Sequence, residues 1–367
     1  MLVAPSAFKG SFSARAAARI LAAALPPGTA PHLLPVADGG DGTAAVLGRA
    51  LAGRVVRVAA RDALGQERRP PVWLLPQGGG AVDLAAVCGL RRLIAGRMPL
   101  RPLDAGTFGL GEALRHLHAL APDGTLLLGL GGSASSDGGA GLLQALGGRL
   151  LDRRGRPIPS GARGLERLAR IDLDAVPAAL SSRLLALVDV SAPLLGAAGS
   201  ARLFGPQKGA DGPTVERLEA ALDRLRHGAE RDLGVDPALA ARAGSGSAGG
   251  VGYALALLGV PLVPGADSVL DRLAFDRYAA ASGRVLVGEG ALDRTSLVGK
   301  APVRAALRAR AAGARVALVC ARADADAKAT LHRAGIVVVA ALPDNGQGRA
   351  DVGALRTASR TAFEALA

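Results

Sequence analysis

Short strand-like runs alternate with alanine- and leucine-rich helical stretches at both ends of this chain, and this alternation limits the fold to the α/β class. Near the N-terminus the pattern predicts strands over 1–4 and 33–37 and helices over 13–25 and 43–52. Near the C-terminus it predicts strands over 284–287, 314–320 and 335–342 and helices over 324–334 and 352–366. We therefore expect the two ends to form one doubly wound, Rossmann-like domain.

The middle of the chain has a different pattern. Strand-like segments separated by turn clusters lie over 55–58, 72–75 and 81–84, which favours antiparallel pairing. Helices are predicted beyond them, over 106–120, 138–146, 214–233 and 249–258. The sequence thus predicts two domains, namely a discontinuous doubly wound α/β domain of residues 1–60 and 285–367 and an inserted mixed-sheet α/β domain of residues 61–284.

Composition argues against several classes of function. The net charge of +13 comes from arginines scattered singly along the chain, and aromatic residues make up 2% of it, so we expect no nucleic-acid partner. No apolar run approaches the roughly 18 residues of a spanning helix, so we expect no membrane partner and a cytoplasmic location. Cys88 and Cys320 are isolated in apolar surroundings, which predicts buried thiols rather than a disulfide or a metal site.

Lysine is rare in this chain. Of the 44 basic residues only four are lysines, and Lys9, Lys208 and Lys300 lie in loops flanked by glycine or proline, whereas Lys328 lies in a helical stretch. An ammonium is a compact point charge, and glycine lets a polyphosphate approach the backbone closely. The three loop lysines therefore predict contacts with phosphate groups.

Two acidic residues occur in the first glycine-rich loop. Asp38 and Asp41 flank Gly39 and Gly40 between a predicted strand and a predicted helix. Carboxylates in such a loop can bind Mg2+ or accept a proton, and the glycines leave room for a ligand. Capping of the helix that follows would account for one of the two acids but not for both.

A longer loop rich in glycine and serine follows a predicted strand in the middle of the chain. Backbone amides and small hydroxyl groups around Gly131, Gly132 and Ser133 are typical of an anion site at a helix N-terminus. Asp137 in the same loop would repel phosphate, which favours a metal or a substrate hydroxyl as its partner. The string Gly129–Ala134 also fits a dinucleotide-binding fingerprint, so an NAD(P)-dependent oxidoreductase is an alternative.

Three further segments carry polar side chains in predicted loops. Asp189 ends a strand-like run, which is where open α/β sheets bind ligands. Gln207 lies in a constrained turn beside one of the loop lysines. Glu289, Asp293 and Lys300 form a set of two acids and a base that suits Mg-nucleotide chemistry. No P-loop string occurs, so a kinase of this sequence would not be of the P-loop type.

Six segments, in this order, resemble motifs of the bacterial glycerate kinase family, of the glycerate 2-kinase type. They are APSAFKGS at 4–11, ADGGDGT at 37–43, GGSASSDGGAG at 131–141, FGPQKGA at 204–210, GSGSAGG at 244–250, and GEGALD with GKAP at 288–302. Each string is modest alone. Six strings in register over about 300 residues are far more specific than any one of them.

The resemblance implies ATP-dependent phosphorylation of D-glycerate with Mg2+, more often at the 2-hydroxyl, and a two-domain α/β fold with the site in the cleft between the domains. In such a kinase we expect Asp189 or Asp293 to act as the base that orients the acceptor hydroxyl. We expect Lys9 and Lys208 to be catalytic and, like Lys300, to face phosphates or the glycerate carboxylate. The residues expected to bind substrate or nucleotide are Asp38, Gly39, Gly40, Gly131, Gly132, Ser133, Asp137, Gln207 and Lys300, and those expected to bind the metal are Asp41 and Glu289.

The chain departs from the family pattern at several positions. Ser6 and Ala7 replace an Asp-Ser pair, and Ser191 and Ala192 stand where the family has an acid or another residue followed by Asn. These changes remove two polar groups that could bind a substrate carboxylate or hydroxyl. A paralogue that binds a related hydroxy acid, with altered or lost catalysis, is therefore an alternative function.

Overall fold

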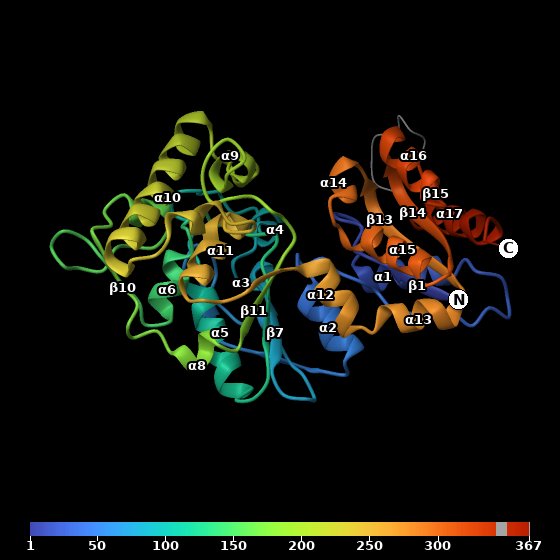
Figure 1. Ribbon diagram of the computed structural model, residues 1–367, viewed down its shortest axis with the longest axis horizontal. Coiled ribbons are helices and arrows are strands. Elements are labelled where there is room, and N and C mark those ends of the chain that lie inside the picture. The colour runs from blue at the N-terminus through green and yellow to red at the C-terminus, as the bar shows by residue number, and fades with distance from the viewer. Residues whose placement is uncertain (343–350, 367) are drawn as a thin grey trace. The chain divides into compact units, whose positions relative to one another are not determined.

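Residues 1–342 and 351–366 are described by the computed structural model of this chain. They divide into two units, and Figure 1 labels many of their helices and strands. The terminal unit joins residues 1–38 with residues 264–367, and the inserted unit consists of residues 39–263. Each unit is built around its own main β-sheet.

The terminal unit contains a five-stranded parallel sheet in the order β15-β14-β13-β1-β2. Its strands are β1 (Leu2–Pro5), β2 (His32–Leu33), β13 (Arg284–Leu292), β14 (Arg315–Ala323) and β15 (Ile336–Ala340). Its helices are α1 (Ala14–Ala22), α12 (Gly265–Arg272), α13 (Phe275–Ser282), α14 (Arg294–Leu297), α15 (Ala301–Ala311), α16 (Ala325–Arg333) and α17 (Val352–Glu364). Parallel strands joined through helices confirm the predicted α/β class.

Alternation along these strands divides their apolar side chains between the two faces of the sheet. Val3, Leu286 and Val319 are fully buried in one cluster with apolar side chains of α1 and α17. Helix α15 packs on β13 and β14, and α12 and α13 pack on α15. The sheet is therefore buried between helices, as the near-continuous apolar runs of its strands require.

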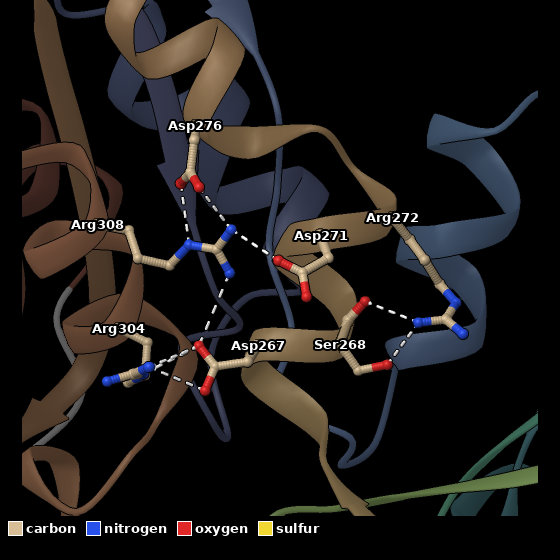
Figure 2. Close-up of polar contacts among 7 residues, drawn as sticks. All are labelled: Asp267, Ser268, Asp271, Arg272, Asp276, Arg304 and Arg308. Carbon is tan, nitrogen blue, oxygen red and sulfur yellow. Dashed lines mark hydrogen bonds and ion pairs between the residues drawn. The ribbon is translucent and has the colours of Figure 1, made fainter. Parts of the chain in front are cut away.

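An ion-pair cluster ties α12 and α13 to α15 (Figure 2). Arg308 lies 2.7 Å from a carboxylate oxygen of Asp271 and 2.7 Å from one of Asp276, and Arg304 lies 2.8 Å from Asp267. Exposed pairs contribute little singly, but a network shares the entropy cost of ordering its side chains. The cluster fixes the helix that begins directly after one of the predicted phosphate-binding loops.

The inserted unit contains a six-stranded mixed sheet in the order β12-β11-β8-β7-β6-β3. Its strands are β3 (Arg54–Arg57), β6 (Pro71–Leu74), β7 (Gly80–Asp83), β8 (Leu126–Gly129), β11 (Leu184–Val188) and β12 (Leu262–Pro264), and two ribbons pair β4 (Ala60–Arg61) with β5 (Glu67–Arg68) and β9 (Arg149–Leu151) with β10 (Arg170–Asp172). Its helices are α2 (Thr43–Ala50), α3 (Leu84–Cys88), α4 (Leu90–Ala95), α5 (Phe108–Leu120), α6 (Ala140–Ala145), α7 (Ala162–Leu165), α8 (Ala178–Ser181), α9 (Ser200–Phe204), η1 (Pro206–Lys208), α10 (Gly212–Leu233), η2 (Pro237–Ala241) and α11 (Ser247–Leu257).

Strand direction changes within this sheet. The strands β3, β6 and β7 pair antiparallel, as the turn-rich sequence predicts, and β7, β8 and β11 pair parallel. Leu110, Leu114 and Leu117 of α5 recur at helical spacing and are fully buried in the core of this unit. Within the described ranges, no helix combines the length and the apolar character that crossing a membrane requires.

Two features differ from the sequence-based expectations. The limits of the units lie at 38/39 and 263/264 rather than at 60/61 and 284/285, because β3 pairs with β6 and α12 packs on α15. Strand β13 continues to Leu292 rather than ending at 287, because its pairing with β14 extends through Glu289. That each unit folds as an independent domain stays a prediction.

Candidate active site

Three parallel strands of the inserted unit end side by side, and an aspartate lies at or directly after two of these ends. Strand β7 ends at Asp83, β8 ends at Gly129, and Asp189 follows the end of β11. Gly129 pairs with Asp83 on one side and with Leu187 on the other, so the three ends share one edge of the sheet. Open α/β sheets bind ligands at this edge.

The loop 39–44 lies against the same edge. The two ends of the loop are joined by a hydrogen bond of 3.1 Å, which the amide of Gly39 donates to Thr43 Oγ1. Gly131 donates its amide to the carbonyl of Gly39 at 3.3 Å. Gly39 has a φ of +93°, and a Cβ there would lie 2.8 Å from the carbonyl oxygen of Leu187, so the close approach requires glycine.

Asp83, which no sequence motif singled out, binds the backbone of this loop from the end of strand β7. Its side chain is buried, and its two oxygens accept the amides of Gly42 at 3.1 Å and Ala44 at 2.8 Å. Burial raises the pKa of Asp83 to about 7, the Ala44 amide opposes the rise, and the charge of Asp41 adds to it. The one available signal was an acid that ends an apolar strand and begins a helix.

The predicted residues Gly40, Gly131 and Asp189 are brought together. A Cβ on Gly131 would lie 2.5 Å from the Cα of Gly40 and 2.8 Å from Oδ2 of Asp189. Glycine at position 131 therefore makes the space in which the loop and the carboxylate meet. Gly132 is exposed with a φ of +77°, and its carbonyl accepts the amide of Leu90 at 2.9 Å.

Asp137 occupies the interior of the glycine- and serine-rich loop. Its carboxylate is fully buried and accepts hydrogen bonds from the amide and hydroxyl of Thr107, at 2.9 and 2.8 Å, and from the amides of Gly139 and Gly141 at 3.2 Å. Burial raises the pKa of Asp137, and the Thr107 hydroxyl is the largest opposing influence. Asp137 therefore stabilises the conformation of the loop through these hydrogen bonds. Its contact with a metal or a substrate stays a prediction.

Ser133 and Lys208 contact the same loop. The hydroxyls of Ser133 and Ser135 lie 2.7 Å apart. Lys208 is only 3% exposed, and its Nζ donates to the carbonyl of Ser135 at 2.5 Å and lies 3.5 Å from the hydroxyl of Ser136. Burial lowers the pKa of Lys208 to about 8, against the raising effect of the negative charge of Asp137. Gln207, the residue before it, is exposed.

A second group of predicted residues gathers in the terminal unit around Ser296, which was also missed from sequence. The Ser296 hydroxyl is fully buried, lies 3.0 Å from Oε2 of Glu289, and accepts a hydrogen bond from Lys300 Nζ at 3.1 Å. Its amide donates to Oδ1 of Asp293 at 2.9 Å, in a capping box that starts α14. A serine three residues after an acid is the signal that could have found it.

Glu289 is the most unusual charged residue of this group. It is 4% exposed, and its Oε1 has no hydrogen-bond partner among the described residues. Burial raises the pKa of Glu289 to about 7, the charge of Lys300 and the Ser296 hydroxyl oppose the rise, and the charges of Asp293 and Asp38 add to it. A buried carboxylate oxygen without a partner needs a proton or a cation.

Asp293 and Lys300 form an ion pair at 3.3 Å. Burial acts to raise the pKa of Asp293, but hydrogen bonds from Thr295 and Ser296 and the charge of Lys300 together hold it below its ordinary value. Lys300 is also the N-cap residue of α15. A single carboxylate oxygen of Asp293, Oδ1, therefore serves both the cap of α14 and the ammonium.

The remaining predicted residues are placed as follows. Lys9 is exposed, and its backbone lies against β13, because a Cβ on Gly290 would be 3.2 Å from the Lys9 amide nitrogen. Asp38 is half-buried in the terminal unit. Asp41 is exposed in the inserted unit, with Oδ2 3.8 Å from Nη1 of Arg91. The two predicted metal ligands, Asp41 and Glu289, thus belong to different units.

The donor set around Glu289 fits Mg2+. Among the described residues, no three or more histidine, cysteine, aspartate or glutamate side chains are grouped so as to hold a metal ion. A nucleotide-linked Mg2+ usually takes one or two protein carboxylates together with phosphate oxygens. The unpartnered Oε1 of Glu289 offers one such hard oxygen ligand.

The geometry does not favour the dinucleotide alternative. A dinucleotide-binding loop opens directly into a helix, but the next helix after β8 is α6, which begins only at Ala140. Asp152, the acid at the spacing expected for a ribose contact, instead accepts the amides of Arg154 and Arg156 in a turn. The Gly129–Ala134 string therefore lacks the structural context of that fingerprint.

Comparison with known proteins agrees with the motif order. A family model described as "Glycerate kinase family" matches residues 1–359. A glycerate kinase of Bacillus subtilis (strain 168) is 35% identical over 84% of this chain and 81% of its own length. A glycerate 2-kinase of Escherichia coli (strain K12) is 33% identical over 83% of this chain and 80% of its own length.

A solved structure points the same way. The crystal structure of a protein of Salmonella typhimurium LT2 assigned as glycerate kinase 2 aligns with a TM-score of 0.81 and 33% identity, covering 100% of this chain and 96% of that chain. Fold, motif order and match over nearly the whole length agree. This chain is therefore a member of the glycerate kinase family and, as such, a phosphoryl-transferring enzyme.

Proposed function

We propose that this chain transfers the γ-phosphoryl group of ATP to D-glycerate, at the 2-hydroxyl. Family membership and the 33% identity to a protein named glycerate 2-kinase support the reaction and its position. The structural observation that carries the proposal is the buried Glu289, whose unpartnered oxygen lies in a group with the Asp293–Lys300 ion pair. Two acids and an ammonium in one group suit a polyphosphate with its counter-cation.

Residues of the terminal unit have the charges for binding the nucleotide. Lys300 presents an ammonium at the start of α15, and Asp293 and Ser296 keep that ammonium in place. Glu289 would hold Mg2+ through Oε1, and Mg2+ when bound neutralises negative charge on the phosphate oxygens. Lys9, whose backbone packs on β13, adds a second positive charge for phosphate.

Residues of the inserted unit suit the acceptor. Asp189 lies at the carboxyl end of a parallel strand beside the glycine loops, so we assign it the role of base that orients the acceptor hydroxyl and takes its proton. Asp293 is the weaker candidate for base because its pKa is lowered and its Oδ1 is used in the cap and the ion pair. Gly39, Gly40, Gly131 and Gly132 would let the acceptor approach the backbone.

Lys208 contributes in a different way from an exposed phosphate-binding lysine. Its ammonium donates to Ser135 and lies close to the hydroxyl of Ser136, so it adds positive charge beneath the glycine- and serine-rich loop. A charge buried in a region of low dielectric acts more strongly on a nearby anion than a solvated one does. We propose that Lys208, together with Ser133 and Asp137, shapes this loop for an anionic ligand.

An assay of ADP release against short hydroxy acids tests the function. We expect turnover with D-glycerate and Mg-ATP, and a product that enolase alone converts to phosphoenolpyruvate. A product that needs phosphoglycerate mutase before enolase acts would move the phosphorylated position to the 3-hydroxyl. Binding of ATP without turnover of any hydroxy acid would identify a paralogue that has lost catalysis.

A further inference from the structure

Asp83 has an unusual location for a buried carboxylate. It ends the apolar strand β7, is 5% exposed, and uses both oxygens on backbone amides of a single loop. Those amides belong to Gly42 and Ala44, at the start of α2, where no side chain of the loop itself acts as the cap. The carboxylate thus supplies, from another strand, the acceptors that the first turn of α2 lacks.

The space around Asp83 depends on glycine. A Cβ on Gly129 would lie 2.7 Å from Oδ1 of Asp83 and 2.9 Å from the carbonyl oxygen of Gly39. Any larger residue at position 129 would therefore displace either the carboxylate or the loop that it holds. The carboxylate, the loop and the end of β8 form one closely packed group.

The loop held by Asp83 carries predicted ligand-binding groups. Gly40 lies against Gly131, which in turn lies against the carboxylate of Asp189, and Asp41 follows Gly40 directly. A shift of this loop by a fraction of an ångström would change the space between Gly40 and Asp189. Catalytic groups need placement within about 0.5 Å of the productive geometry.

We propose that Asp83 is a positioning residue, which fixes the loop 39–44 in the conformation that phosphoryl transfer requires, and that Gly129 keeps the space in which it does so. Asp83 acts through the backbone amides of the loop rather than by touching a substrate. This role in catalysis rests on the proposed kinase reaction, whereas the role in ordering the loop does not.

The variant Asp83→Asn tests the proposal, because Asn fits the same space but places an amide donor against one of the two backbone amides. We expect faster hydrogen exchange at the amides of residues 39–47, and exchange in β8 and β11 unchanged. We expect kcat for D-glycerate to fall by at least about tenfold, the size of one lost charge-assisted hydrogen bond. Asp83→Ala should enlarge both effects.

Asp62→Asn is a matched control. Asp62 is also buried, and its Oδ1 accepts the amides of Leu64 and Gln66, both at 3.0 Å, in the turn between β4 and β5. This variant should raise exchange in its own turn and leave kcat and KM within about twofold of the wild type. Equal kinetic losses in the two variants would show that Asp83 has only a structural role and would overturn the proposal.

A second variant covers the case in which Asp83→Asn does not fold. Thr43→Val removes the hydroxyl that closes the same loop through Gly39 while keeping the shape of the side chain. It should reproduce the faster exchange of the loop and the loss of kcat. Faster loop exchange with unchanged kinetics in either variant would disprove the role of Asp83 in catalysis. Unchanged exchange would disprove the whole proposal. If the wild type itself turns over no glycerate, the kinase function fails while the exchange result still decides whether Asp83 orders the loop.

Discussion

The hydroxyl of Ser296 donates a hydrogen bond of 3.0 Å to Oε2 of the buried Glu289. The same hydroxyl accepts a hydrogen bond from Lys300 at 3.1 Å. One small side chain thus connects the proposed metal ligand with the proposed phosphate-binding ammonium. The relationship explains how an acid and a lysine 11 positions apart along the chain can share one environment.

Removal of that hydroxyl should therefore affect more than stability. We expect Ser296→Ala to lower the free energy of unfolding by about 1–2 kcal/mol and to raise the KM for Mg-ATP by about tenfold or more. Chemical denaturation and steady-state kinetics measure the two effects. Ser359→Ala is the control, because Ser359 is equally buried and donates to the carbonyl of Leu21 at 2.9 Å. A similar loss of stability in both variants, with an unchanged KM in both, would contradict the connecting role of Ser296.

The choice of base can be tested with two isosteric variants. Asp189→Asn should keep its fold and lose roughly two or more decades in kcat, because a general base contributes that much. Asp293→Asn keeps an oxygen for the cap of α14 and loses the charge opposite Lys300, so its main effect should be a raised KM for ATP. Single-turnover rates separate the two outcomes. The opposite pattern would make Asp293 the base.

Glycine at position 131 should be indispensable for steric reasons alone. In Gly131→Ala the new Cβ would lie 2.5 Å from the Cα of Gly40 and 2.8 Å from Oδ2 of Asp189, so we expect a loss of about 1–3 kcal/mol in stability and a much lower kcat. Gly212→Ala, at the first position of α10, is the control because a Cβ there meets nothing within 4 Å. Full activity in Gly131→Ala would mean that the loop 39–44 moves freely.

Lys208 should make stability depend on pH in the alkaline range. Its pKa is lowered by burial to about 8 from 10.5, so between these values the unfolded chain holds a proton on this amine that the folded chain has released. The stability of the wild type relative to Lys208→Met should therefore rise by about 3 kcal/mol as the pH increases from 8 to 10.5. Denaturant titrations at several pH values measure this difference.

Below pH 8 the amine is protonated in both the folded and the unfolded chain, so the difference between Lys208→Met and the wild type should stay constant there. A difference that does not change between pH 8 and 10.5 would show that the ammonium is not desolvated in solution.

The lysines can also be compared in kinetic assays. Lys208→Ala should lower kcat or raise KM by at least about tenfold, whereas Lys328→Ala should change neither by much.

The sequence was sufficient for the fold class because strand and helix periods are local properties. Strands such as β14 and β15, and helices such as α10 and α17, lie close to their predicted ranges. The end of β13 was not predictable, because Gly288 and Gly290 weaken the local strand signal while pairing with β14 maintains the strand through Leu292. Pairing between distant segments therefore decided this boundary.

Residues that the structure groups together could be singled out from the sequence where a motif is contiguous and could not where it is not, whereas the active site that they would form stays a prediction. The loop with Asp38 and Asp41 and the set of Glu289, Asp293 and Lys300 are visible as strings of acids and glycines. The role of Asp83 could not be read from a contiguous motif, because its hydrogen-bond partners lie 39 positions or more away along the chain. Burial was the other hidden property, since nothing in the sequence near Lys208 indicates that its ammonium is enclosed.

The order of strands in the terminal sheet has a consequence for biosynthesis. Strand β1 lies between β2 and β13, and Ser6 bonds to Gly288, 282 positions later in the chain. During translation, β1 therefore cannot pair with β13 until the whole inserted unit has been synthesised. The usual order, in which the N-terminal part folds first, is reversed here. The inserted unit can fold while β1 still lacks its main partner, because β13 begins at Arg284, beyond the end of that unit.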